Sequence, residues 1–151
     1  MLYKHFTSKQ ALFAAALEEA SGRVEGQWDQ MFSMPGNLLS NWKQALPIIM
    51  NDSAYVEMMQ LRKLAVTIVD DPAIRATLDG MHHRLEERVA LFVGNAKAEG
   101  WMREDVEPEF VSWMWLGLIW AGCLREAMEP RGFSKMLPIA EAFIDGLRPI
   151  A

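Results

Sequence analysis

Two adjacent histidines, with acidic residues one helical turn further on, are the first group in this chain that could do chemistry. His82 and Glu86, like His83 and Glu87, are four residues apart and would share one face of a helix. Imidazole and carboxylate groups bind metal ions or transfer protons, but a metal site needs more ligands from other helices. A di-iron bundle repeats Glu-x-x-His on two helices, and this chain has no such repeat. We therefore expect no metal and interpret the histidines as a solvated polar face or a single hydrogen bond in a pocket.

The single cysteine gives no stronger sign of chemistry. Cys123 belongs to the apolar segment from Phe110 to Leu124, without a second thiol or a nearby lysine that would favour a thiolate. We expect it to be buried as packing. The sequence also contains no nucleophile elbow, phosphate-binding loop or zinc motif. We predict neither an enzyme nor a cofactor.

The composition predicts one soluble domain. A chain of 151 residues that is 51% hydrophobic can bury a core, and its 11 methionines and 6 tryptophans suit either a pocket or a plain core. The net charge of -5 provides no basic field for phosphates, so the chain as a whole should bind nucleic acid poorly. A lone cysteine and the lack of a secretory signal pattern predict a cytoplasmic protein. The longest apolar stretch is shorter than the ~20 residues of a membrane span, so we expect no membrane partner.

Apolar residues recur at three- and four-residue spacing along most of the chain, and no useful length alternates with period two. This pattern predicts an all-α bundle of about six helices. We expect Thr7 and Gln10 to form a capping box at the first helix, Pro47 to kink or split the second, and Ser53 to cap the third. The first predicted helix follows Thr7 and is closed by Pro35-Gly36. The other predicted helices cover 37–51, 53–69, 72–99, 108–128 and 136–147, with 101–107 as a polar connection.

The helix predicted from Phe110 to Leu124 is apolar almost all round, with Gly117 and Gly122 allowing another backbone to come close. A small domain hides only one face of such a helix. We therefore expect its second face to meet a partner.

The N-terminal residues carry a more specific pattern. From Leu2 to Phe13 the order is Leu-Tyr-Lys-His-Phe-Thr-Ser-Lys-Gln-Ala-Leu-Phe. The segment resembles the end of the recognition helix, the turn and the linking helix of TetR-family transcriptional regulators. The resemblance implies that Leu2 and Phe6 fill a small helix-turn-helix core, while Tyr3, His5 and Lys9 present polar groups to DNA phosphates.

Two further segments are similar to that family. Glu99 to Pro108 resembles its Glu-Gly-x-x-Arg-x-Asp connection, and Phe143 to Pro149 resembles its Gly-Leu-Arg-Pro ending. The departure is at the front, because the family has two more helices and most of the recognition helix before this point. We expect residues 1–9 to be a remnant of the DNA-binding domain, with latent phosphate contacts only, and residues 10–151 to be the ligand-binding and dimerisation domain.

The resemblance implies a small-molecule pocket enclosed by the middle helices, for a hydrophobic or amphipathic ligand. Core packing is the competing interpretation for each residue taken singly. The candidate pocket residues are Trp42, Met50, Tyr55, Met58, Met59, Met81, His82, Trp113 and Trp120.

The resemblance also implies a homodimer in which the last two helices pack against their copies. Burial inside one subunit is the open alternative for these residues. The candidate interface residues are Trp113, Trp115, Leu118, Ile119, Phe143 and Leu147.

The function implied is that of a ligand-responsive transcriptional repressor, in which a bound small molecule shifts the subunit arrangement and residues 8–32 act as a lever. DNA would be a partner only of a chain that includes the missing N-terminal helices. Two alternatives stay open: a dimerising interaction protein that titrates a full-length paralogue, and a small helical ligand-binding protein such as a carrier.

Overall fold

The computed structural model describes residues 6–128 and 136–149, and for residues 119, 123 and 125–128 it describes the backbone alone. The described chain is all-helical, with six helices and no strand, which confirms the predicted fold class. The helices are α1 (Lys9–Ser33), α2 (Leu38–Asn51), α3 (Ser53–Thr67), α4 (Pro72–Ala98), α5 (Pro108–Met128) and α6 (Leu137–Gly146).

Polar side chains begin the first four helices, and two of them stand one residue away from the predicted caps. The cap of α1 is Ser8, whose Oγ accepts from the Ala11 N–H at 3.0 Å, so the predicted capping box on Thr7 is wrong. The cap of α3 is Asp52 instead of the predicted Ser53, which is the first residue of the helix. The Oδ1 of Asp52 accepts from the Ala54 N–H at 2.8 Å.

Proline and glycine residues mark other helix boundaries. The predicted start of α4 at Pro72 is confirmed, with Asp71 as its cap. Gly100, with a φ of 74°, follows the end of α4, and the N–H groups of Gly100 and Trp101 donate to the carbonyls of Lys97 and Ala96. Pro47 lies inside α2 without splitting it, so that alternative of the sequence prediction is wrong.

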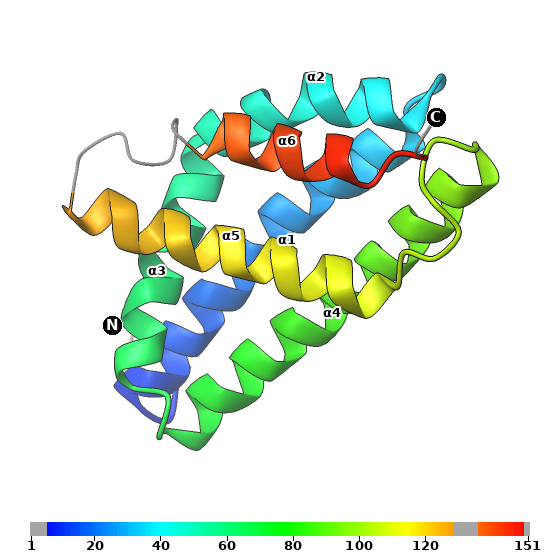
Figure 1. Ribbon diagram of the computed structural model, residues 1–151. Coiled ribbons are helices and arrows are strands. Elements are labelled where there is room, and N and C mark those ends of the chain that lie inside the picture. Colours follow the sequence, from blue (N-terminus) through cyan, green and yellow to red (C-terminus); the bar gives the residue numbers. More distant parts are fainter. Residues whose placement is uncertain (1–5, 129–135, 150–151) are drawn as a thin grey trace.

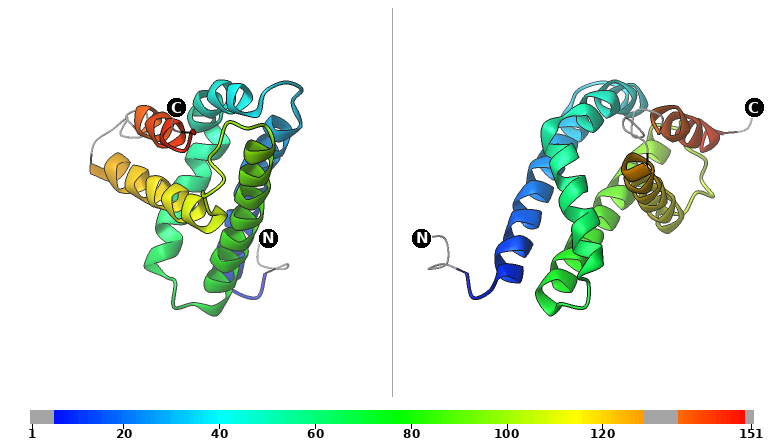
Figure 2. Two further views of the ribbon diagram at one scale, coloured as in Figure 1. Left: turned by 45° about the vertical axis from the view of Figure 1, so that its right-hand side comes forward. Right: turned by 90° about the vertical axis from the view of Figure 1, so that its left-hand side faces the viewer.

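The long helices α1 and α4 pack side by side, and α3 packs against α1 (Figure 1). Helix α5 crosses α4, while α2 and α6 lie next to each other at one end of the bundle. The beginnings of α1 and α4, with the turn between α3 and α4, lie at the opposite end in all three views (Figure 2). The predicted lever, residues 8–32, therefore runs from one end of the bundle to the other.

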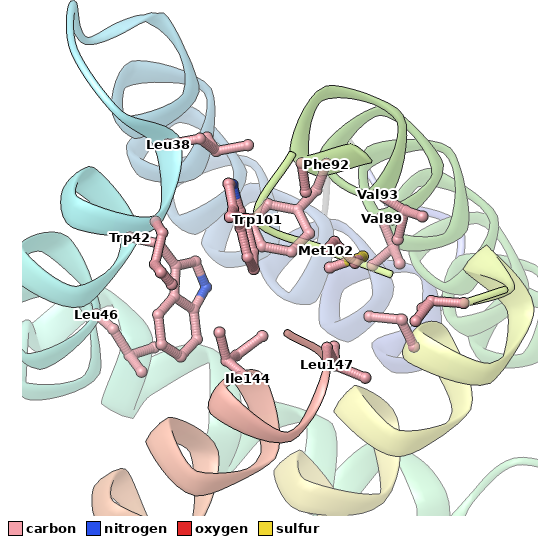
Figure 3. Packing of buried hydrophobic residues seen from close by; sticks show 14 of the residues in the cluster. Leu38, Trp42, Leu46, Val89, Phe92, Val93, Trp101, Met102, Ile144 and Leu147 are labelled. Carbon is pink, nitrogen blue, oxygen red and sulfur yellow. The ribbon is translucent and has the colours of Figure 1, made fainter. Parts of the chain in front are cut away.

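The buried side chains form two hydrophobic clusters within the described chain. One joins the first half of α1 to α3 and the first half of α4. The other joins α2 and α6 to the second half of α4 and includes Trp42, Phe92, Trp101 and Ile144 (Figure 3). Trp28 packs against both clusters, so α1 links the two parts of the core.

The connection between α4 and α5 is part of the core and not the polar loop that the sequence predicted. Trp101, Met102 and Val106 are at most 7% exposed. The Trp101 ring meets the Phe92 ring edge-on at 5.5 Å, and the Arg103 N–H donates to the Leu147 carbonyl at 3.0 Å. The sequence does not predict this burial, because charged residues separate the three apolar ones and a loop has no fixed period that would identify an inner face.

Replacing Gly100 by alanine should destabilise the protein by about 1–2 kcal/mol, because its left-handed backbone puts a Cβ too close to the neighbouring carbonyl. Gly94, in the exposed interior of α4 with no described atom near an added Cβ, is the matched control. Gly94→Ala should instead stabilise by about 0.5–1 kcal/mol. Urea unfolding of both variants measures the two changes, and equal signs would contradict the helix end described above.

Candidate functional site

A cavity of about 90 Å³ lies between the two hydrophobic clusters, and each of the helices α1 to α6 contributes to its wall. Its surface is mostly apolar and aromatic, as small-molecule sites usually are. The apolar lining residues are Val24, Trp28, Phe32, Trp42, Tyr55, Met58, Met81, Leu85, Val89, Phe92, Val111, Trp115 and Ile144.

Three tryptophans form the most rigid part of this wall. The Trp115 ring makes edge-to-face contacts with Trp28 at 5.8 Å and with Trp42 at 5.7 Å, measured between ring centroids. Such contacts add about 0.5–1.5 kcal/mol each to the burial of the rings. Helix α5 presents Trp115 to the cavity while Trp113, two residues earlier, is 68% exposed, since two residues turn a helix by roughly half a circle.

Charged residues line the cavity on the side where α1 meets α4. Nε of Arg84 donates to both carboxylate oxygens of Glu25 in α1, at 3.1 Å to Oε1 and 3.0 Å to Oε2. Nη1 of Arg88 forms an ion pair with the same Oε2 at 3.2 Å. Ser21 Oγ donates to the same carboxylate at 2.8 Å. Glu25, Arg88 and Ser21 all line the cavity, so these ion pairs form part of its wall.

The ion pairs continue along both helices. Arg84 also contacts Glu18 at 2.8 Å, and Nε of Arg88 donates to Asp29 at 3.0 Å. The hydrogen bond to Asp29 is the main cause that raises the pKa of Arg88 above its ordinary value. Burial opposes the charge of Arg84, but hydrogen bonds to Glu18 and Glu25 outweigh it and raise that pKa as well. Both guanidinium groups stay charged, and they hold α1 against α4.

Arg62 of α3 is the second cation in the cavity wall besides Arg88. Its residue is 4% exposed, and its guanidinium carbon lies 5.3 Å from the centre of the Trp120 ring. An arginine so deeply buried is uncommon, and a cation over an indole face gains from the ring quadrupole. The cavity therefore combines an aromatic wall with a buried positive charge.

His82 lies beside this region and outside the cavity lining. Its Nε2 is buried and finds no hydrogen-bond partner among the described residues. Burial, followed by the nearby charge of Arg62, lowers the pKa of His82, while Asp79 and Glu86 oppose that shift. His83 points to solvent, with Glu87 3.4 Å away, so only one of the two predicted His-Glu pairs is in contact.

The structure brings four of the nine predicted pocket residues to the cavity: Trp42, Tyr55, Met58 and Met81. Met59 of α3 is buried in the core, and Met50 and Trp120 pack partly buried against the same cluster, so these three belong to the core around the site. His82 is half-buried beside the cavity, and Trp113 lies on the outer surface.

Sequence reasoning missed the polar lining and part of the aromatic lining. Arg62 follows Tyr55 by seven residues and Met58 by four, so helical spacing alone places it on the predicted pocket face. Glu25 likewise stands beside Val24 on the apolar stripe of α1. A charge on an apolar stripe was the available signal. The missed lining residues are Ser21, Val24, Glu25, Trp28, Phe32, Arg62, Leu85, Arg88, Val89, Phe92, Val111, Trp115 and Ile144.

The predicted interface residues divide between the core and the surface. Leu147 is 3% exposed and Trp115 lines the cavity, so both pack inside the subunit, the alternative that the sequence left open. Leu118 and Phe143 are partly buried against the core, and Trp113 is exposed. The side chain of Ile119 lies outside the described set.

The surface of α5 nevertheless carries an apolar stripe. Its exposed members are Phe110 and the residues three, four and fourteen positions later, Trp113, Met114 and Leu124. Gly117 and Ala121, which lie between them, are exposed as well. Ile139 of α6 is 50% exposed as well. A stripe of this spacing is the kind of surface that a partner helix covers.

The N-terminal candidates are placed in part. Lys9 is the exposed first residue of α1, next to the Ser8 cap. Tyr3 and His5 lie outside the described residues, as does the side chain of Cys123. Helix α1 begins at Lys9, so the expected boundary between residues 9 and 10 lies within its first turn.

No cluster of three or more potential metal ligands occurs in residues 6–128 and 136–149, leaving aside side chains that are not described. Within the same residues, no helix is both long and apolar enough to cross a membrane. Comparisons of the chain with protein-family models, with curated proteins and with solved structures gave no match.

The half-buried His82 predicts a pH dependence of stability. Because its pKa is lowered in the folded state, the unfolded chain binds the proton more readily. The unfolding free energy should therefore fall as pH decreases below about 6.5, and level off below the folded-state pKa. His82→Gln should flatten this part of the profile in urea titrations. His83→Gln, on a side chain that is 73% exposed, is the control and should leave the His82 contribution in place.

Proposed function

We propose that this chain is the cytoplasmic ligand-binding and dimerisation body of a ligand-responsive transcriptional repressor that resembles the TetR family. The observation that carries the proposal is the aromatic cavity at the centre of an all-α bundle. Its walls come from every described helix, so an occupant would contact the whole bundle at once. The N-terminal motif from Leu2 to Phe13 supplies the link to transcription, because it leads directly into α1.

Helix α1 is the element that would transmit the ligand signal. It contributes Val24, Glu25 and Trp28 to the cavity, and its other end begins at Lys9, in the DNA-contact motif. The pairs from Arg84 and Arg88 to Glu25 hold this helix to α4 directly at the cavity wall. A ligand that binds two arrangements of α1 with different affinity shifts the equilibrium between them, which is the thermodynamic basis of induction.

Dimerisation would use the apolar stripe of α5 with the adjoining α6. Phe110 and Phe143 join the two helices, with ring centroids 6.3 Å apart. Trp113 stands at the exposed side of that junction, and Gly117 allows a second backbone to come close. A two-fold axis passing next to this stripe, between two copies of the chain, would cover the stripe with its own copy. Specific DNA binding then belongs to a dimer that also carries complete reading helices, since the net charge of -5 offers phosphates little attraction.

A cavity-filling substitution tests the ligand-binding part. Val111, 2% exposed, lines the cavity, whereas Val106, 3% exposed, belongs to the same cluster and does not. Replacing either by phenylalanine should cost about 1–3 kcal/mol of stability through overpacking. A panel of small aromatic compounds is screened on the wild-type chain by thermal shift, where a ligand at 100 times its Kd adds about 2.7 kcal/mol. Val111→Phe should lose the response of every hit and Val106→Phe should keep it; equal responses would disprove binding in this cavity.

A charge on the α5 stripe tests the dimer. Trp113→Arg should weaken self-association by about 2 kcal/mol or more, the cost typical of an interface hot spot, and produce monomers in sedimentation equilibrium. Leu91→Arg is the matched control, because Leu91 of α4 has the same 68% exposure. The control should sediment as the wild type. A monomeric wild-type chain, or equal weakening by both variants, would contradict the proposed interface.

A further inference from the structure

The charged groups in the cavity wall determine which class of small molecule can enter. Among the described lining residues these groups are Glu25, Arg62 and Arg88. Inside an apolar enclosure a charge acts on an occupant far more strongly than it would in water. The selectivity of the cavity therefore depends on whether these three groups already have partners within the chain.

Glu25 already receives its polar contacts from its own chain. A carboxylate offers about four lone-pair positions. Nε of Arg84 donates to both oxygens, Arg88 approaches Oε2 at 3.2 Å, and Ser21 donates to Oε1 at 2.8 Å. A cationic ligand would have to displace one of these groups and would then lie beside the two arginines. The carboxylate therefore does not favour a cation in the cavity.

The two arginines of the wall have partners as well. Nε and Nη2 of Arg88 donate to the two oxygens of Asp29 at 3.0 and 3.1 Å, and Nη1 pairs with Glu25. The Arg62 guanidinium carbon lies 5.3 Å from the centre of the Trp120 ring, and Arg62 has a further interaction within the chain. An anionic ligand would have to compete with these partners, and separating a partly buried ion pair is costly. The arginines therefore do not favour an anion.

The rest of the wall is mainly apolar or aromatic and suits an uncharged occupant. Trp28, Trp42 and Trp115 all line the cavity, and a ring packs well against other aromatic rings. An apolar cavity of roughly 150 Å³ binds benzene, so a volume of 90 Å³ requires a modest enlargement to hold one ring. Met58 and Met81 are the lining side chains that adapt most easily to such an enlargement.

Resting on the proposed ligand-binding function, we propose that the cavity takes a small, uncharged, largely apolar ring compound and rejects ions of either sign. The ring lies against the three tryptophans. An ion of the same size would lose its water shell and would gain a partner in the wall only by displacing one that is already bound. The ion pairs of Glu25 therefore serve selectivity as well as the packing of α1 on α4.

Three probes with the same ring and one further carbon test this selectivity: benzyl alcohol, benzylamine and benzoate. Each is titrated into the full chain at neutral pH, where the amine is a cation and the acid an anion, with tryptophan fluorescence and ligand-observed NMR as readouts. Benzyl alcohol should bind about tenfold or more tightly than either ion, because only the ions lose strong hydration on entry. A smaller preference over either ion overturns the proposal.

Glu25→Gln tests the part played by the ion pairs. It should raise the affinity for benzoate several-fold and narrow the preference for the alcohol, because Nη1 of Arg88 loses its carboxylate partner at the wall. Glu18→Gln is the matched control, since Glu18 of the same helix pairs with Arg84 and does not line the cavity. The control should keep the wild-type order of affinities. Unchanged benzoate affinity in Glu25→Gln overturns the role of the pairs; if this variant does not fold, the three wild-type affinities still decide.

A result against this selectivity is distinct from a result against ligand binding itself. If none of the three probes binds up to millimolar concentration, the selectivity proposal is overturned, whereas the proposed function is judged by the wider Val111→Phe screen. Hits in that screen that are all ions would overturn only the selectivity. Benzyl alcohol should also bind Val111→Phe more weakly than the wild-type chain, and equal binding would place it outside the cavity and overturn the selectivity proposal.

Discussion

The edge-to-face packing of Trp115 between Trp28 and Trp42 is the contact on which the centre of this bundle depends. It ties α5 to α1 and to α2 at one point. Indole rings are rigid and have only two rotatable side-chain bonds, so they fix the distance between the helices that carry them. All three rings line the cavity, so this aromatic contact fixes part of its wall.

The sequence predicted the elements well where local chemistry decides them. Pro72 and Gly100 mark the limits of α4 because their backbones are restricted or permissive regardless of the rest of the fold. The capping residues were harder to predict, since Thr7 and Ser8 both carry a hydroxyl group. Only the hydrogen bond that the Ala11 N–H donates to Ser8 Oγ distinguishes between them. Burial of Trp101 and Met102 depends on α2 and α6 arriving from elsewhere in the chain, and no local pattern contains that information.

The site was less predictable than the helices for a related reason. On a helix that is apolar all round, such as α5, periodicity does not tell the inner face from the outer one. Trp113 and Trp115 have the same residue type and opposite environments. The methionine and tyrosine positions of α3 were easier, because Glu57, Gln60 and Lys63 mark an exposed side of that helix. Arg62 and Glu25 are charged, and because charge usually marks the solvent side of a helix, their residue types do not predict a cavity wall.

The wall of the cavity is unequal in stiffness, and this determines where an occupant can act. The tryptophan contact and the aligned ion pairs between α1 and α4 resist displacement, because each would lose directional contacts that no neighbour replaces. Met58 and Met81 change shape at little cost. An occupant would therefore be accommodated first on the methionine side. Under the proposed function, a ligand that also reaches Glu25 or Arg88 would compete with the pairs that hold α1 and would couple its binding to the position of Lys9 at the far end of that helix.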